Sequence, residues 1–346
     1  MFREITIYDI AEALNLSAAT VSRALKDHPA IHKDTKKLVR EKAEEMGYRF
    51  NAFASNLRRK RTNTIGVIVP RLNSNFMSSV LSAMEWVANE AGYNLVITQS
   101  QESVQKEIAN TLTLFNSRVD GLLVSLASDT ADYRHFNRFI DRRIPLLFFD
   151  RVPDEAFSRA SVVIDNLEAG REATLHLIGQ GCRRIMHVTG DLKRNVYQDR
   201  YEGFRQAMIQ NGLEVPADGL VINDLSVSAG EQVAMQIHQM GEKPDGIFIA
   251  NDLCAVSFMK AFRELGYAIP EDIAVVGFND DPVSRFIEPE LTTIRYSGTE
   301  VGEVALKTLL QTLDNELSPD ELSKTLLPHK LVVRQSSLKK KIAVTE

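Results

Sequence analysis

The feature that most limits the fold of this chain is an alternation of short apolar runs with longer amphipathic stretches, from Thr64 to about residue 295. The runs are rich in β-branched residues and have the length of strands, and the stretches repeat apolar residues at helical spacing. Such alternation predicts parallel sheets covered on both faces. Strands are expected at 64–70, 94–100, 121–126, 145–150, 161–165, 184–190, 220–223, 246–250, 273–278 and 292–295, and helices at 76–91, 104–116, 167–179, 200–211, 229–240 and 253–265. This number of strands fits either one barrel or two doubly wound sheets.

Polar residues directly follow several of the apolar runs, at Asp150, Asp165, Asn251 and Asn279. Ligands of open α/β sheets bind beyond the carboxyl ends of the strands, so these side chains could line a binding site. Asp and Asn also begin helices as caps, which is the alternative reading. Capping explains Asp165 at least as well, whereas a lining role is favoured for Asp150 and Asn279.

Residues 6–25 have the pattern of two short helices joined by a tight turn. Thr6 and Asp9 resemble a capping box, with Asp where Glu or Gln is preferred. Asn15 marks the turn, and Ser17 can cap the second helix. The segment therefore predicts a helix-turn-helix.

A third helix is expected over residues 34–46, and Gly47 is its C-terminal stop. The helical spacing places Leu38, Val39 and Ala43 on its inward face. Three helices with so few apolar residues make a small domain of limited stability.

The charge of the chain is divided unevenly. The net charge is −5, yet residues 1–61 contain thirteen Lys and Arg against eight Asp and Glu, a surplus of five positive charges. The remainder therefore carries −10. A basic head on an acidic body predicts that the head meets a polyanion and the body does not. The run at 58–61, Arg-Arg-Lys-Arg, is either a solvated linker or a phosphate contact.

Several classes of protein are disfavoured. Cys182 and Cys254 are too few for a zinc site or a disulfide framework, so no metal and no cofactor is expected. Neither a signal peptide nor an apolar run of ~20 residues is found, which favours an intracellular protein. The G-x-G at Gly179 and Gly181 lacks the third glycine of a nucleotide loop, and no P-loop, G-x-S-x-G or H-E-x-x-H occurs. We do not expect an enzyme.

The chain resembles the LacI family of bacterial transcription regulators in TIYDIAEALNLSAATVSRAL, TNTIGVIVP, VVIDNLEAGREATLHLI, DRYEGF, KPDGIFIAND, IAVVGFNDDP and PELTTIRY, which follow the family's order along nearly the whole chain. The resemblance implies an all-α helix-turn-helix DNA-binding head and a hinge helix, joined to a two-lobed α/β body like the type I periplasmic binding proteins, with doubly wound parallel sheets. The expected domains are 1–50 for the head, 51–62 for the hinge helix and basic linker, and 63–340 for the effector-binding and dimerisation domain. Within the body, the N-lobe would be 63–163 plus 295–324 and the C-lobe 164–294 plus 325–340.

The family motif places Ala18, Ala19 and Arg23 at the base-reading positions of the second helix, which enters the major groove. We hypothesise that Arg23 carries most of the direct readout, because arginine can bind guanine O6 and N7 together, worth ~1–3 kcal/mol. In the hinge, Leu57 matches a leucine that enters the minor groove, although Phe50 stands where the family commonly has proline. The other DNA-binding candidates are Thr6, Ser17, Thr20, Ser22, Asn51, Ala54 and Arg58.

The hydroxyl groups among these candidates have two possible uses. They can contact phosphates, or they can bond to the backbone of their own helix. Capping is favoured for Ser17 and phosphate contact for Ser22.

The resemblance also identifies a ligand cleft between the lobes. Its candidate residues are Phe76, Ser125, Asp150, Arg151, Arg200, Asn251, Asn279 and Tyr296. An aromatic face beside carboxylate, guanidinium and amide groups suits a sugar or sugar derivative, and a purine or other small metabolite is the alternative. Arg151 could instead pair with a phosphate or carboxylate of the ligand. The function that follows is an effector-controlled repressor that binds double-stranded operator DNA as a homodimer, with a higher oligomer as the alternative. A free sugar-binding protein, which should lack the basic head, is a further alternative.

Overall fold

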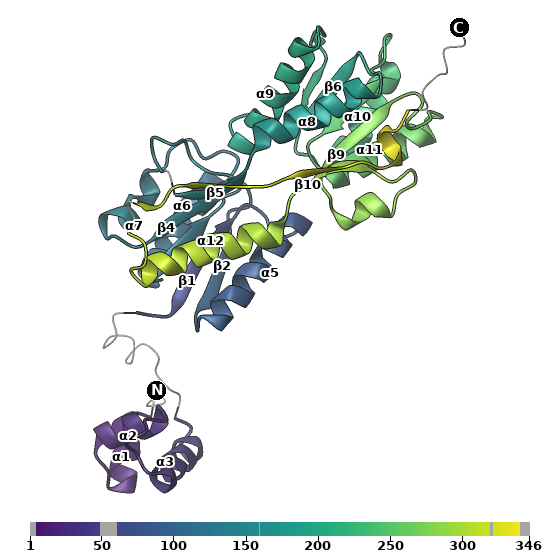
Figure 1. Cartoon of the computed structure of the whole chain (residues 1–346). Coiled ribbons are helices and arrows are strands. Elements are labelled where there is room, and N and C mark those ends of the chain that lie inside the picture. Colours follow the sequence, from purple (N-terminus) through teal and green to yellow (C-terminus); the bar gives the residue numbers. More distant parts are fainter. Residues whose placement is uncertain (1–4, 49–60, 159, 319–320, 340–346) are drawn as a thin grey trace. The chain divides into compact units, whose positions relative to one another are not determined.

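The chain forms two compact units, Met1–Thr62 and Asn63–Glu346. The computed structural model describes residues 5–48, 61–158, 160–318 and 321–339 (Figure 1). The expected hinge residues Asn51, Ala54, Leu57 and Arg58 lie outside the described residues, as does Phe50.

Capping side chains begin the first two helices of the head. Its three helices are α1 (Ile7–Leu14), α2 (Ala18–Leu25) and α3 (Lys33–Glu45). The Asp9 carboxylate accepts a hydrogen bond from the Thr6 backbone N–H at 2.7 Å. Asn15 ends α1 with a φ of 53°, and the Ser17 hydroxyl then accepts from the Thr20 N–H at 3.1 Å. The helix-turn-helix expected from the sequence is present.

The core of the head is small. Its buried apolar residues are Ile10, Ala11, Val21, Ala24, Val39 and Ala43. The inward placement of Leu38 was wrong, because its side chain is 49% exposed. Val39 and Ala43 lie one turn apart and face the core, and a residue next to Val39 is rotated about 100° away from that direction.

The body contains two six-stranded sheets within the described residues, which decides between the barrel and the two-sheet alternatives. The first sheet has the order β11-β5-β4-β3-β1-β2, and the second has the order β12-β10-β9-β8-β6-β7. The strands of the first are β1 (Thr64–Val69), β2 (Asn94–Gln99), β3 (Gly121–Val124), β4 (Leu146–Phe149), β5 (Ser161–Ile164) and β11 (Lys324–Leu327). Those of the second are β6 (Ile185–Thr189), β7 (Leu220–Ile222), β8 (Gly246–Ile249), β9 (Ala274–Asn279), β10 (Thr292–Arg295) and β12 (Lys330–Val332). Of the pairings, only that of β10 with β12 is antiparallel in the described part of the chain.

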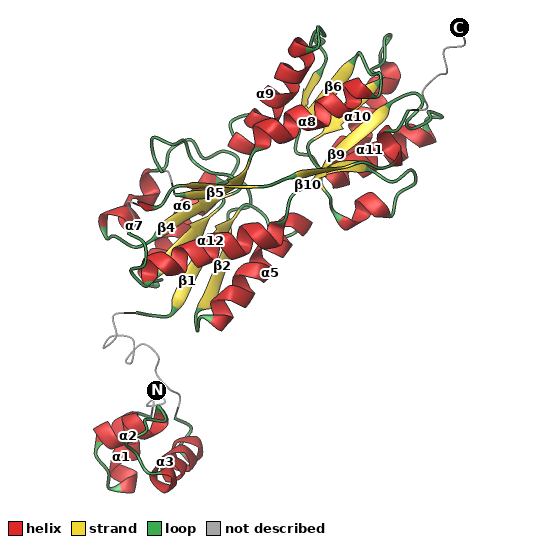
Figure 2. Ribbon diagram, viewed as in Figure 1, coloured by secondary structure: helices red, strands yellow, loops and turns green. Residues whose placement is uncertain are grey.

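Helices cover both sheets, as the alternation predicts (Figure 2). The first sheet has α5 (Asn75–Glu90), α6 (Val104–Asn116), α7 (Asn137–Asp141) and α12 (Gly298–Leu313), and the second has α8 (Asn166–Gly179), α9 (Asn195–Gln210), α10 (Val227–Gln239) and α11 (Asp252–Glu264). Helix α9 begins five residues before the expected start at 200, and α7, α12, β11 and β12 were not expected. Among the described residues, no helix has the length and apolar character needed to cross a membrane.

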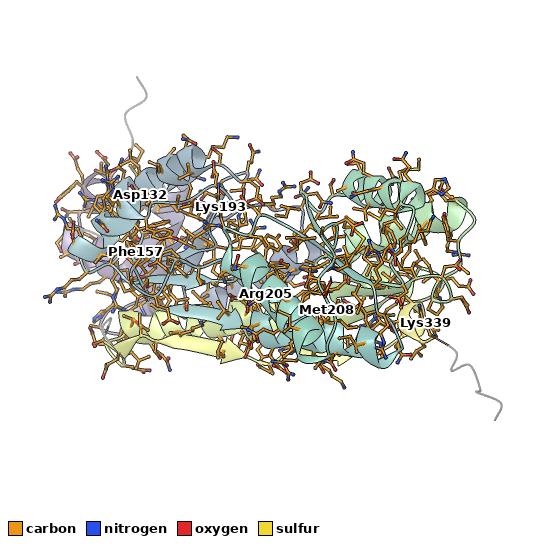
Figure 3. The ribbon with its side chains drawn as sticks, turned by 90° about the horizontal axis from the view of Figure 1, so that it is seen from above. Asp132, Phe157, Lys193, Arg205, Met208 and Lys339 are labelled. Atoms are coloured by element: carbon orange, nitrogen blue, oxygen red, sulfur yellow. The ribbon has the colours of Figure 1, made fainter. Side chains whose placement is uncertain are left out.

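Each sheet with its helices forms one lobe, and the chain passes from one to the other three times, after β5, after β10 and after β11 (Figure 1). In Figure 3, Asp132 and Phe157 lie in the first lobe and Lys339 at the far end of the second. The third passage corrects the expected boundary at residue 324. Strand β11 extends the first sheet by pairing with β5, from Lys324 beside Ser161, so residues 325–327 belong to the first lobe.

Candidate functional site

A cavity of about 630 Å³ lies between the two lobes of the body. The residues after β1, β2 and β4 line it from the first lobe, and those after β6, β7, β8 and β9 line it from the second. This position beyond the carboxyl ends of parallel strands is the usual ligand site of open α/β sheets.

The structure brings seven of the eight predicted cleft residues together around this cavity. They are Phe76, Asp150, Arg151, Arg200, Asn251, Asn279 and Tyr296. The exception is Ser125, which is fully buried and does not line the cavity. Its backbone N–H still donates to the Ile68 carbonyl at 2.9 Å, so it remains within the sheet beside β1.

Aromatic rings form one wall of the cavity. The Phe76 and Tyr296 rings line the cavity and lie 4.5 Å apart, and the fully buried Phe278 ring lies behind them, 5.6 Å from Tyr296. The Arg200 guanidinium sits over the Phe278 ring at 3.5 Å, and its Nε donates to the Asn166 side chain at 2.8 Å. Arg200 is only 3% exposed, so these contacts fix its position against the aromatic wall.

Two polar residues at strand ends have a strained backbone. Asp150 follows β4 with a φ of 57°, and Asn279 ends β9 with a φ of 121°. Residues other than glycine adopt such angles where the surrounding structure compensates for the strain, which is frequent at ligand sites. Burial raises the pKa of the Asp150 carboxyl, and Arg151 and Arg200 oppose that rise.

The capping alternative holds for Asp165. Its carboxylate accepts from the Glu168 N–H at 2.9 Å at the start of α8, and it does not line the cavity. Asn251 is both a helix cap and a cavity residue. Its side chain accepts from the Cys254 N–H at 3.1 Å at the start of α11, and it also lines the cavity.

A buried carboxylate, Asp252, supports the loop that carries Asn279 and Asp281. Asp252 accepts a hydrogen bond from the Asp281 N–H at 2.8 Å and one from the Thr293 hydroxyl at 2.7 Å. Its side chain is fully buried, and burial raises the pKa of this carboxyl to about 7. The Asp252 carboxyl group therefore links α11, β10 and the loop after β9.

Glu102 is a cavity residue that the sequence did not reveal. It lies three residues after β2, where Gln101 and Glu102 have φ angles of 52° and 61°. Its carboxylate accepts from Arg151 Nη1 at 2.7 Å and from Arg71 Nε at 3.2 Å. The signal available was a charged residue just beyond a strand, which is too common to single it out.

The first turn of α9 connects the lobes beside the cavity. The Asn195 side chain accepts from the Val152 N–H at 3.0 Å and donates to the Asp150 carbonyl at 3.0 Å. The Arg194 guanidinium donates to the Thr130 carbonyl. These bonds join the second lobe to the first.

The exposed side of α2 carries two of the three expected base-reading residues. Ala19 and Arg23 are exposed, and Lys26 follows them on the same side of the helix. Ala18 is half-buried and packs against the core of the head. Ser22 is half-buried.

Three of the candidate hydroxyls have partners within the head. The Thr6 hydroxyl donates to the Asp9 carboxylate at 2.7 Å, and the Ser17 and Thr20 hydroxyls lie 2.8 Å apart. Local capping therefore occupies these groups in the free head, in agreement with the reading favoured for Ser17.

Neither cysteine lines the cavity between the lobes. Cys182 and Cys254 are buried free thiols. Within residues 5–48, 61–158, 160–318 and 321–339, no group of three or more His, Cys, Asp or Glu is arranged to hold a metal ion.

Two family models match the chain. The model described as "Bacterial regulatory proteins, lacI family" matches residues 6–51, and that described as "Periplasmic binding protein-like domain" matches residues 174–337. The HTH-type transcriptional regulator RegA of Clostridium saccharobutylicum is 30% identical over 334 residues, which cover 96% of this chain and 99% of that protein.

Solved structures of two transcription regulators are similar to this chain over nearly its whole length. The Lac repressor dimer bound to operator and the anti-inducer ONPF has a TM-score of 0.85 and 26% identity, covering 97% of this chain and 100% of that chain. The complex of the transcriptional regulator CelR with cellobiose has a TM-score of 0.72 and 25% identity, covering 96% and 100%. These relatives are transcription regulators and not enzymes, and the expected fold class is confirmed. The chain belongs to the LacI family of bacterial regulatory proteins.

Proposed function

We propose that this protein is a sequence-specific, DNA-binding transcriptional repressor whose operator affinity is controlled by a sugar or sugar derivative bound between the lobes. The observation that carries the proposal is the cavity itself, which joins an aromatic wall to convergent carboxylate, guanidinium and amide groups. Its volume of about 630 Å³ is suited to a small molecule.

The sugar assignment rests on the chemistry of the wall. Phe76 and Tyr296 offer apolar ring faces to the C–H side of a sugar, and Asp150, Asn251 and Asn279 offer paired acceptors and donors to its hydroxyls. CelR, which shares this fold, was solved with cellobiose. A purine remains the second candidate, because the same rings could stack on a flat base.

The DNA assignment rests on the basic head and the exposed residues of α2. Arg23 is the residue proposed to read bases, with Ala18 and Ala19 beside it. Asn51, Ala54, Leu57 and Arg58 are proposed to contact DNA from the hinge. The Lac repressor was solved as a dimer bound to operator, and we infer that this chain also acts as a homodimer.

Control of DNA binding requires that the ligand prefer one arrangement of the lobes over another. The bonds of Asn195 and Arg194 across the cavity rim belong to the arrangement seen here. A ligand that strengthens this arrangement would alter how the two heads of a dimer are held for two half-sites.

The test uses the full-length protein and duplexes selected from a random pool. Fluorescence anisotropy should show salt-dependent, sequence-selective binding that changes by at least about tenfold with one member of a sugar panel. A nucleobase panel is run beside it. Absence of selective duplex binding would remove the regulator assignment, and a response to nucleobases alone would replace sugar with purine.

A further inference from the structure

Three arginines, Arg71, Arg151 and Arg200, line the cavity. Arginine is well suited to pair with a phosphate or carboxylate, so their presence raises the question of whether the ligand is charged. We propose that Glu102 determines the charge class of the ligand: by occupying Arg71 and Arg151 it excludes acidic and phosphorylated compounds and leaves a site for an uncharged polyhydroxylated molecule. This inference rests on the cavity of the proposed function.

Glu102 forms an ion pair with both arginines at once. One carboxylate oxygen accepts from Arg71 Nε at 3.2 Å, and the other accepts from Arg151 Nη1 at 2.7 Å. The second oxygen also accepts from the Ser128 backbone N–H at 3.0 Å. The Glu102 side chain is 17% exposed and that of Arg151 is 13% exposed, so solvent screens this pair only weakly.

The backbone holds Glu102 in this position. Gln101 and Glu102 both have left-handed φ angles, which cost energy for residues other than glycine. The Ser128 N–H bond ties the carboxylate to the loop after β3. A side chain held from two sides behaves as a fixed part of the wall and is not easily displaced by an incoming anion.

Arg200 is also held by protein groups. Its Nε is bonded to Asn166, its Nη1 donates to the Ala250 carbonyl at 3.3 Å, and its plane covers Phe278. It is directed toward protein partners and is 3% exposed.

The remaining charged groups of the wall are acidic. They are Asp150, Asp224, Glu231 and Asp281. Among the described lining residues, five carboxylates including Glu102 therefore face three arginines. An anionic ligand would meet repulsion from these carboxylates, while Glu102 offsets the charge of Arg71 and Arg151.

A purely structural role for Glu102 makes a different prediction. If the carboxylate only braced the loops, its replacement by the isosteric amide would lower stability and leave anion binding unchanged. If it sets ligand charge, Glu102→Gln should expose Arg71 and Arg151 to anions.

The experiment titrates sulfate into full-length wild type and Glu102→Gln at constant ionic strength, by calorimetry. We expect the variant to bind sulfate at least about tenfold more tightly than wild type does. Glu231→Gln is the matched control, since it removes one charge from the same wall and no arginine of the described chain is paired with Glu231. Its gain in sulfate affinity should be much smaller than that of Glu102→Gln, because it weakens the repulsion without releasing an arginine. The gain should vanish in Glu102→Gln with Arg151→Gln.

Equal sulfate affinity in wild type and Glu102→Gln would overturn the proposal, as would an equal gain in Glu231→Gln. In a second arm, each neutral sugar that binds wild type is compared with its own uronate and 6-phosphate, which we expect to bind about 100-fold more weakly. An acidic derivative that binds as tightly as its parent would also overturn the proposal. If no sugar binds, the proposed effector fails, while the sulfate arm still decides the role of Glu102.

Discussion

Asp150 and Asp165 follow neighbouring strands of one sheet, but their carboxylates have different partners. Asp150 turns into the cavity from a left-handed backbone position, and Asp165 caps α8. Sequence context is the same for both, an apolar run followed by an acid. The difference lies in the backbone after each strand. Asp150 has a left-handed φ and is followed by a loop, whereas Asp165 is followed directly by α8.

We expect substitutions of Asp150 and Asp165 to have different effects. Asp150→Ala should abolish the ligand response, because it removes acceptors from the cavity wall. Asp165→Ala should keep the ligand response and lower the free energy of unfolding by ~1 kcal/mol through the lost cap. Ligand titration and urea unfolding of both variants measure the two effects. An exchange of these phenotypes would contradict the placement of the two side chains.

Arg23 and Lys26 lie on the same exposed side of α2 and allow a second comparison. We expect Arg23→Ala to lose ~1–3 kcal/mol of discrimination between a selected duplex and a scrambled one, because a bidentate base contact is removed. Lys26→Ala should weaken binding to both duplexes similarly and reduce the salt dependence by about one phosphate contact. Full operator preference in Arg23→Ala would show that bases are read elsewhere.

At the scale of elements, Asp252 connects α11, β10 and the loop that ends in Asp281. Burial raises the folded-state pKa of Asp252 to about 7, against 3.8 for an ordinary aspartate. The folded protein therefore retains a proton that the unfolded chain releases. The resulting stabilisation is fully present below pH ~4 and is lost as pH rises through 7.

Asp252→Asn removes this titration and provides the test. The stability of wild type minus that of the variant should fall on the order of 2–3 kcal/mol between pH 5 and pH 8. Urea unfolding at a series of pH values measures the difference, in which groups common to both proteins cancel. A difference that is constant or rises with pH would show that Asp252 is ionised in the folded state at pH 5.

The strands expected from the sequence are all present, because buried parallel strands read as apolar runs. Strands β11 and β12 were missed. They are four and three residues long, lie at sheet edges and contain Lys324 and Lys330, so they lack a continuous apolar run. The start of α9 was missed because its first residues do not follow an apolar repeat. Asn195 contacts the other lobe and Tyr197 lines the cavity, so both positions are occupied by polar side chains.

At the scale of the whole molecule, the uneven charge separates two binding activities. The basic segment 1–61 should bind duplex by releasing counterions, with log K falling by about 0.9 per phosphate contact for each unit of log salt. An uncharged ligand in the cavity has no such dependence and should change affinity by less than about twofold from 50 to 200 mM salt. Anisotropy and calorimetry on the same preparation measure both slopes. A steep slope for the ligand would indicate that it is charged.

The sequence by itself determined the helix-turn-helix and the strand-helix order, since caps and periodicity are encoded by residues close together in the chain. Strand ends indicated Asp150, Asn251 and Asn279, and the resemblance to the LacI family supplied the other predicted cavity residues. The alternation of strands and helices left one barrel or two sheets open, and the tertiary structure shows two sheets. Only the tertiary structure decided that Ser125 stays inside one of them and that Glu102 meets Arg71 and Arg151. Those partners are 31 and 49 residues away from Glu102. No local pattern encodes a charge pairing over such separations, because it exists only once the loops after β1, β2 and β4 meet at the edge of the sheet.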